Sequence, residues 1–396
     1  MSDTLMSTYA PLPVTFEKGD GVWLWDTEGK QYLDALSGIA VCGLGHTHPA
    51  VTKAICEQAG TLIHTTNIYA IQHQQTLADK LTKLAGMDSV FFGNSGAEAN
   101  EAAIKIARLY GHSKGIDQPT IIVMEDSFHG RTLATLSATG NRKVQAGFEP
   151  LVSGFLRVPY NDLDAIAAVA KNNQNVVAVL VEPVQGEAGI QIPDENYLPG
   201  IRQLCDDNGW LMMLDEIQTG MCRSGQWFAH QRESLNGNAV PDVMTLAKAL
   251  GNGVPIGACL ARGEAAKQFN PGNHGSTYGG NPLVCKTALT VIEVLENEKL
   301  APRAAELGAY ILAGFEKNLA DVDGLTEIRG QGMLIAIELD RPCAELVKTA
   351  LDNGLLINVT AEKIVRLLPP LIMSDAEADQ LITKLSDIIN QFLAAA

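Results

Sequence analysis

The chain has 396 residues, which is long enough for one large domain and a smaller one around a sizeable buried core. Its 45 acidic and 29 basic residues give a formal net charge of −16, which argues against a general surface for nucleic acid or anionic membranes. This balance does not exclude anionic substrates, because a locally basic pocket fits inside an acidic protein.

The seven cysteines are scattered, odd in number and contain no C-x-x-C pair, so we expect free thiols rather than a disulfide framework. No apolar run approaches the roughly 18 to 20 residues of a membrane span. The first residues lack the basic start and apolar core of an export signal. These features predict a cytoplasmic protein.

The first two thirds of the chain predict an α/β pattern. Residues 22–26 and 31–34 form a candidate antiparallel hairpin, and residues 49–63 and 72–84 have helical periodicity. Short apolar runs then alternate with helices at 97–110 and 197–208, as in α/β proteins. Several runs are apolar throughout, which is typical of strands buried on both faces of a parallel sheet. The candidate strands are residues 89–93, 120–125, 155–158, 176–182, 210–215, 243–247 and 256–261.

The last third predicts a smaller α+β domain. Its candidate helices are residues 282–296, 302–319, 344–353 and 375–392, and its candidate strands are 334–338 and 364–368. We expect residues 1–45 to form an N-terminal segment that joins this small domain. Residues 46–285 would form the large domain, and residues 286–396 the C-terminal small domain.

Two segments combine glycines with chemistry-bearing residues at the ends of predicted strands. Residues 93–100, Gly-Asn-Ser-Gly-Ala-Glu-Ala-Asn, follow a strand and open a helix, whose free N–H groups suit a phosphate. An ordinary helix start with Asn94 or Ser95 as N-cap explains them equally well. Asp215 and Glu216 end an apolar strand, where open α/β sheets bind ligands, although surface carboxylates also occur there.

Two further segments lie later in the large domain. Lys248 follows an apolar run and precedes a glycine-rich turn, where burial would lower its pKa and make its amine nucleophilic. A surface lysine with a buried stem is the alternative. Residues 275–282, Gly-Ser-Thr-Tyr-Gly-Gly-Asn-Pro, are typical of a second anion-binding turn or of a simple loop.

The order and joint occurrence of these segments resemble the class III aminotransferases of fold type I, over essentially the whole chain. Within that class the chain is most similar to the acetylornithine aminotransferases. The resembling segments are residues 38–49, 91–100, 127–132, 181–187, 215–220, 246–250, 275–282 and 365–370. The resemblance implies an α/β fold in which a mostly parallel seven-stranded sheet lies between helices, beside a smaller α+β domain. The large domain would bind pyridoxal 5′-phosphate.

The resemblance also assigns roles around that cofactor. Lys248 would carry it as a Schiff base and move the proton between substrate and cofactor. Asp215 would pair with the pyridine nitrogen, so that the ring can accept electrons. Thr277 would reach the phosphate bound by a neighbouring subunit, which implies a homodimer with shared active sites. The remaining cofactor-binding residues would be Ser95, Gly96 and Ala97 at the phosphate, Phe128 and Ile217 on the ring faces, and Gln218 at the ring oxygen.

Substrate carboxylates would be held by two arginines. Arg366 matches the arginine that grips the α-carboxylate of glutamate or 2-oxoglutarate, and Glu182 matches a glutamate that shields it in the other half-reaction. Arg131 matches the arginine that takes the α-carboxylate of ornithine-type donors. Ser276 is a further substrate-binding candidate. The chain departs from close relatives at Cys42-Gly43, a stretch that lines the substrate entrance in the family.

The predicted reaction is transamination of N²-acetyl-L-ornithine with 2-oxoglutarate, giving N-acetyl-L-glutamate 5-semialdehyde and L-glutamate, a step of arginine biosynthesis. Succinylornithine, ornithine, 4-aminobutyrate and succinyl-diaminopimelate transamination are the alternatives within the class. A racemase, aminomutase or decarboxylase would use the same cofactor differently, and a binding module would leave Lys248 unmodified. We expect no metal site, because His46 and His48 have no further ligands at suitable spacing.

Overall fold

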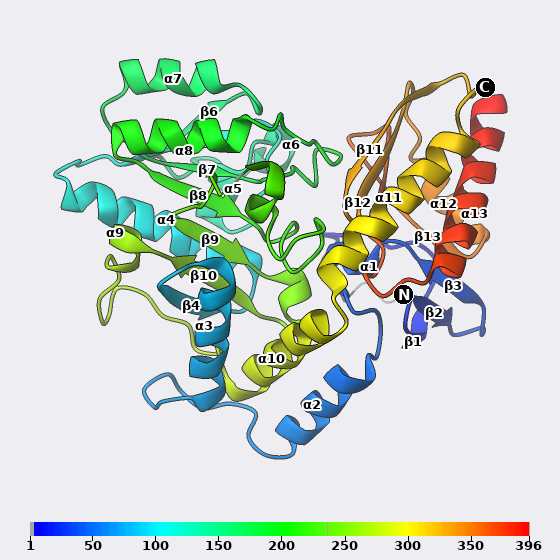
Figure 1. Ribbon diagram of the computed structural model, residues 1–396, viewed down its shortest axis with the longest axis horizontal. Helices are drawn as coiled ribbons and strands as arrows, with labels where there is room; N and C mark the ends of the chain where they lie inside the picture. Colours follow the sequence, from blue (N-terminus) through cyan, green and yellow to red (C-terminus); the bar gives the residue numbers. More distant parts are fainter. Residues whose placement is uncertain (1–3, 236, 396) are drawn as a thin grey trace.

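A seven-stranded sheet forms the centre of the larger part of the molecule (Figure 1). The computed structural model describes residues 4–235 and 237–395. The strand order is β4-β10-β9-β8-β7-β5-β6. These strands are β4 (Ser89–Gly93), β5 (Thr120–Met124), β6 (Phe155–Val158), β7 (Val176–Val181), β8 (Leu211–Asp215), β9 (Val243–Leu246) and β10 (Gly257–Ala261).

The predicted α/β fold with a mostly parallel sheet is confirmed. Strands β9, β8, β7, β5 and β6 pair in parallel, and β10 runs antiparallel to both of its neighbours. All seven predicted strands are present, with ends that differ by at most one residue. Glu125 and Glu182, predicted as the last residues of two strands, lie just beyond them, because the sheet interior is apolar and these carboxylates are not.

Helices cover both faces of this sheet, and the alternation of side chains along each strand decides which helix each residue meets. On β5, Ile121 and Val123 pack in one apolar cluster with α4 (Gly96–Ser113), while Ile122 and Met124 face the opposite cluster with α7 (Leu163–Asn172) and α8 (Tyr197–Asn208). Both clusters are fully buried in their centres. Both faces of the sheet are therefore apolar, and polar side chains lie at the ends of its strands.

The remaining helices connect or flank the sheets. Helix α2 ends at Ala59, before the predicted end at residue 63, and Gly60 is its C-cap. Helix α11 starts at Leu300, two residues before the predicted start at residue 302, because a proline is tolerated in the first turn of a helix. These helices are α1 (Ser37–Ala40), α2 (Pro49–Ala59), α3 (Gln72–Ala85), α5 (Leu133–Ala138), α6 (Arg142–Gln145), α9 (Gly263–Ala266), α10 (Pro282–Asn297), α11 (Leu300–Asn318), α12 (Glu345–Asp352) and α13 (Asp375–Ala394), with short 3₁₀ turns η1 (Ala229–Gln231), η2 (Glu233–Leu235) and η3 (Lys248–Leu250).

Two four-stranded sheets lie in the smaller part of the molecule, on the right of Figure 1. One has the antiparallel order β11-β12-β15-β14. The other has the order β1-β2-β3-β13, in which β3 and β13 pair in parallel and so join the two ends of the chain. Their strands are β1 (Phe16–Asp20), β2 (Trp23–Asp26), β3 (Gln31–Asp34), β11 (Leu325–Gln331), β12 (Leu334–Leu339), β13 (Leu355–Leu356), β14 (Asn358–Thr360) and β15 (Ile364–Leu367).

A buried arginine connects the segment after β8 with the C-terminal part. Arg223 is 1% exposed and donates hydrogen bonds to the carbonyl oxygens of Met333 and Pro369. Burial lowers the pKa of Arg223 to about 9. The contact fixes the position of the C-terminal strands relative to the large sheet. The exact limits of the two domains stay a prediction.

The histidine pair of the N-terminal segment has partners other than a metal. His46 Nε2 lies 2.8 Å from Asp34 Oδ2, and this hydrogen bond, together with Cys42, raises the pKa of His46 to about 9. His48 lies 3.7 Å from Glu298. None of the helices within residues 4–235 and 237–395 combines the length and the apolar composition that crossing a membrane requires.

Candidate active site

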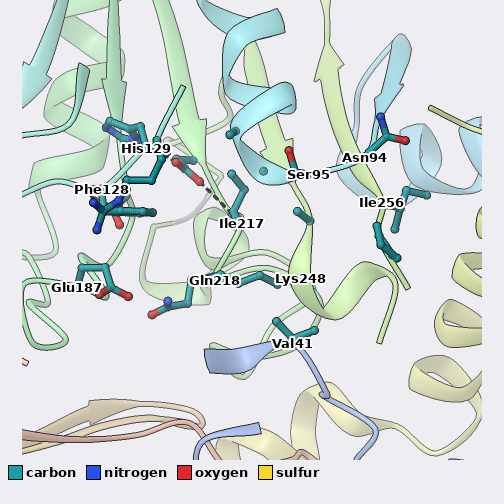
Figure 2. A pocket seen from close by; sticks show the side chains of 18 of the residues that line it. Val41, Asn94, Ser95, Phe128, His129, Glu187, Ile217, Gln218, Lys248 and Ile256 are labelled. Atoms are coloured by element: carbon teal, nitrogen blue, oxygen red, sulfur yellow. Dashed lines mark hydrogen bonds and ion pairs between the residues drawn. The ribbon is translucent and has the colours of Figure 1, made fainter. Parts of the chain in front are cut away.

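A cavity of about 410 Å³ opens where several strands of the large sheet end. Segments that follow β4, β5, β7, β8 and β9 all contribute side chains to it, because these strands point the same way and their carboxyl ends meet at one edge. Figure 2 shows Lys248 in this cavity, with Glu187 and Phe128 to its left and Ser95 above it. Ten of the predicted site residues line the cavity, namely Ser95, Gly96, Ala97, Phe128, Arg131, Glu182, Asp215, Ile217, Gln218 and Lys248.

Lys248 is the first residue of η3 and is separated from the end of β9 by Ala247 alone. Its φ of 43° lies in the left-handed region, which is uncommon for a residue with a side chain. The turn sends the lysine into the cavity instead of along the strand. Burial lowers the pKa of Lys248 to about 8, although nearby Glu187 opposes the shift. A substantial share of these amines is therefore uncharged and nucleophilic near neutral pH.

Asp215, the last residue of β8, is 4% exposed and is held by three donors. Its Oδ1 accepts the Ile217 N–H at 3.1 Å. Its Oδ2 accepts a hydrogen bond from the Nδ2 of Asn100 at 2.7 Å and lies 2.8 Å from the Nδ1 of His129. A buried carboxylate with this support can face a cationic ring nitrogen in a fixed orientation.

The start of α4 forms a cradle for an anion. The backbone N–H groups of Gly96 and Ala97 belong to the first turn of an 18-residue helix, where intrahelical acceptors are missing and the helix dipole is positive. Ser95 caps this turn by accepting the Glu98 N–H at 3.2 Å, as the alternative interpretation of this segment expects. A Cβ at Gly96 would lie 2.7 Å from Ile217 Cδ1, so a larger residue there would push the Ile217 side chain out of its place beside the cavity.

Two apolar side chains and one amide complete the ring-sized part of the cavity. Phe128 and Ile217 line it, and the Arg131 guanidinium lies 5.6 Å from the centre of the Phe128 ring. Gln218 is 9% exposed, and its Oε1 has no hydrogen-bond partner among the described residues. A buried amide without a partner is costly unless a ligand completes it.

The structure corrects the partner expected for Arg366. Its Nη1 lies 2.7 Å from Glu187 Oε1, whereas Glu182 accepts the Phe128 N–H at 3.1 Å. The ion pair with Arg366 is therefore made by Glu187 and not by Glu182, because the turn after β7 brings the later glutamate to β15. Burial opposes ionisation of Glu187, but the Arg366 guanidinium outweighs it and lowers the pKa of Glu187.

Glu182 and Arg366 have different surroundings. Burial, and then the charge of Asp215, raises the pKa of Glu182 well above its usual value. Arg366 is fully buried, with its Nε donating to Asn358 Oδ1 at 2.9 Å and its Nη2 without a hydrogen-bond partner among the described residues. An unsatisfied buried guanidinium nitrogen next to an ion pair suits exchange of one carboxylate for another.

Three predicted residues do not line the cavity, namely Ser276, Thr277 and Arg366. Arg366 is connected to it through Glu187, which does line it. Ser276 Oγ accepts hydrogen bonds from Asn94 Nδ2 and from the Gly279 N–H, both at 3.0 Å. Thr277 is exposed to solvent next to this loop. Since Asn94 lines the cavity, the loop lies close to the site without closing it.

Several residues at the cavity were not assigned roles by the sequence. Val41 lines it from the N-terminal segment, and His129 lines it beside Asp215. Glu187 was quoted as part of a motif without a role of its own. Two glutamates, Glu182 and Glu187, follow β7 in the sequence. Their spacing alone does not tell which of them reaches an arginine.

These features fit pyridoxal 5′-phosphate. Lys248 would supply the amine for its aldehyde, Asp215 a carboxylate for its ring nitrogen, and the start of α4 a cradle for its phosphate. Apolar side chains line the cavity, and the partnerless oxygen of Gln218 is available to a polar atom of the cofactor.

Comparison with known proteins shows the family of this chain. The family model for class-III aminotransferases matches residues 5–389. The chain is 61% identical to the acetylornithine aminotransferase of Nitrosomonas europaea over 98% of both chains, and 46% identical to that of Methanothermobacter thermautotrophicus over 98% of this chain and 96% of the relative.

Solved structures agree as well. The ornithine aminotransferase of Toxoplasma gondii superposes with a TM-score of 0.95 at 35% identity, covering 99% of this chain and 94% of that one. The acetylornithine aminotransferase of Elizabethkingia anophelis gives a TM-score of 0.87 at 36% identity, covering 98% and 96%. The chain therefore belongs to the class-III aminotransferases, enzymes that depend on pyridoxal phosphate.

Proposed function

We propose that this protein transfers the δ-amine of N²-acetyl-L-ornithine to 2-oxoglutarate, giving N-acetyl-L-glutamate 5-semialdehyde and L-glutamate. The observation that carries the proposal is a pair of arginines, of which Arg131 lines the cavity and Arg366 contacts the lining residue Glu187. Arg131 stands over Phe128 without an acidic partner in the described ion pairs, while Arg366 is paired with Glu187. Two different carboxylate substrates that alternate in one site need two cations of this kind.

In the first half-reaction, Arg131 would bind the α-carboxylate of acetylornithine, which leaves the distal amine near Lys248. The bound cofactor supplies the electron sink for breaking the C–H bond next to that amine. Lys248 would then move the proton, since its lowered pKa lets the amine accept and release it near neutral pH. Phe128 and Ile217 would pack on the two faces of the cofactor ring, hold it in place and exclude water.

In the second half-reaction, Arg366 would bind the α-carboxylate of glutamate or 2-oxoglutarate. Glu187 must leave the guanidinium for this to happen, and its partly exposed side chain has room to turn away. While acetylornithine is bound, Glu187 stays on Arg366 and neutralises it. The exchange of one carboxylate for another would let a single pocket accept an ω-amine and an α-amine in turn.

We also propose a homodimer with shared active sites. Large apolar side chains are exposed around the loop that carries Thr277, which favours a covered interface over free surface. Thr277 would then reach the phosphate held by the neighbouring subunit's α4. The exposed side chains are Leu62, Ile63, Ile68, Tyr69 and Tyr278.

The physiological setting follows from the substrates. The reverse direction, from glutamate to acetylornithine, would serve arginine biosynthesis in the cytoplasm. The free state of all seven cysteines suits a reducing compartment.

The decisive experiment is a titration of the purified holoenzyme with acetylornithine, succinylornithine, ornithine and 4-aminobutyrate in turn. Loss of the visible absorbance of the lysine-bound cofactor reports amine transfer from each donor. Acetylornithine is expected to have the highest second-order rate constant. Ornithine is the strongest competitor, because ornithine aminotransferases have the same fold. A higher rate constant with any other donor would reassign the substrate without changing the family.

A further inference from the structure

Asn100 occupies a position that none of the roles above uses. It lies in the second turn of α4, the helix whose start forms the phosphate cradle, and it is completely buried. Its Nδ2 donates to Asp215 Oδ2 at 2.7 Å and to the carbonyl oxygen of His129 at 2.8 Å. Its Oδ1 accepts the hydroxyl of Thr245 at 2.8 Å. Both amide hydrogens are therefore used, and the carbonyl oxygen has a donor.

The Thr245 hydroxyl helps to determine which way this amide points. Asp215 and Thr245 are paired neighbours on β8 and β9, and α4 packs over both strands. With the oxygen of Asn100 held by Thr245, its nitrogen faces the carboxylate. The reverse orientation would place the amide oxygen against Asp215 Oδ2 and the His129 carbonyl, where three acceptors would meet without a hydrogen.

The same cluster restricts His129. The side chain is buried, and its Nε2 has no hydrogen-bond partner among the described residues, whereas its Nδ1 faces Asp215 Oδ2. A neutral ring that carries its hydrogen on Nδ1 satisfies this geometry without leaving an unpaired N–H. Asp215 Oδ2 thus receives two neutral donors, while Oδ1 accepts only the Ile217 N–H. Oδ1 keeps the larger capacity for a ligand.

We propose that Asn100, oriented by Thr245, is a positioning residue that sets the carboxylate of Asp215 for the cofactor's ring nitrogen. This inference rests on the proposed function, because it concerns the ring that Asp215 would meet. Three buried side chains from α4, β8 and β9 act together. The helix that holds the phosphate therefore also fixes the opposite end of the ring, and β9 connects this cluster to Lys248 three residues later.

The test uses holoenzyme loaded with cofactor that is ¹⁵N-labelled at the pyridine nitrogen. The variants are Asn100→Leu, which keeps the volume but removes the amide, and Thr245→Val, which removes only the hydroxyl. Thr245→Ser keeps the hydroxyl and is the matched control. The ¹⁵N resonance reports whether the ring nitrogen carries a proton, which a purely structural change elsewhere would not alter.

In wild type and Thr245→Ser we expect the resonance of the protonated ring. In Asn100→Leu it should move toward that of the unprotonated ring, with kcat lowered by about tenfold or more and KM for 2-oxoglutarate nearly unchanged, as for loss of a hydrogen bond to a charged group. Thr245→Val should shift in the same direction by less, which keeps the test informative if Asn100→Leu does not fold.

An unshifted resonance in both variants would overturn the proposal, even if their thermal stability falls. Failure of the wild-type protein to bind the cofactor or to transfer amines would instead overturn the proposed function. A normal wild type with unshifted variants removes only the role of Asn100.

Discussion

Cofactor uptake by the cofactor-free protein is expected to follow the ionisation of Lys248. Its pKa is lowered from 10.5 to about 8 by burial. At pH 7 roughly one such amine in ten is uncharged, compared with roughly one in 3,000 for an ordinary lysine. The reactive form is therefore enriched by about 300-fold. The rate constant for attachment of pyridoxal phosphate should rise about tenfold per pH unit below neutrality and level off above about pH 8.

Stopped-flow absorbance at constant ionic strength measures this profile. The control for titration of the cofactor itself is a lysine amide that is acetylated on its α-amine and keeps a free ε-amine, mixed with the same aldehyde. The rate constant of this reaction should keep rising toward pH 10.5. A protein profile that rises in parallel with the control through pH 10 would refute the lowered pKa. Lys248→Met should show no attachment, while non-covalent binding through the α4 cradle persists.

The same shift predicts an effect on stability. The folded-state pKa of Lys248 lies below the unfolded value, so the unfolded chain binds more protons between about pH 8 and 10.5. This group therefore costs stability fully below pH 8, and the cost disappears as pH rises through that window. Lys248→Met should raise the free energy of unfolding of the cofactor-free protein at pH 7, by at most about 3 kcal/mol because cavity water screens the charge. Urea denaturation at pH 7 that shows a destabilised variant would contradict this.

Three further substitutions test the division of labour in the site. Arg366→Ala should slow the glutamate half-reaction by at least about a hundredfold and the acetylornithine half-reaction much less, since a buried charge-assisted contact is lost; equal losses in single-turnover traces would exclude this. Glu187→Gln should slow the acetylornithine half-reaction more, because Arg366 is then no longer neutralised; an unchanged ratio of the two half-reactions would disprove the shield. Thr277→Val should weaken cofactor binding by about tenfold with the dimer intact, measured by cofactor release and sedimentation; unaltered release would leave Thr277 without a role at the phosphate.

The large sheet was predictable because its strands are apolar at nearly every position. Such a run can be recognised in the sequence without knowing which strands and helices pack against it. Strand β11 was missed because Leu325–Gln331 carries Thr, Glu, Arg and Gln and lies partly exposed. Strands β13 and β14 are too short to have a period of their own.

In the site, residues that follow strand ends were predictable from polar interruptions of apolar runs. The Glu187 partner of Arg366 was not, because the path of the turn after β7 decides which of two glutamates reaches β15. Asn100 was also hidden, since an asparagine inside a helix has no special signal until the carboxylate it meets is known.

The parallel pairing of β3 with β13 has a consequence for how the protein is made. During synthesis on the ribosome, Leu33 emerges long before its partner Leu355. The edge of β3 that pairs with β13 therefore stays unpaired until most of the chain has been made. The first and last residues of β3, Gln31 and Asp34, are polar, which limits unwanted association of this strand during that delay. A chain that stops before Leu355 would lack β13, and the N-terminal strands β1, β2 and β3 would then have no partner on the open edge of β3. A nonsense mutation late in the reading frame would therefore damage both ends of the enzyme.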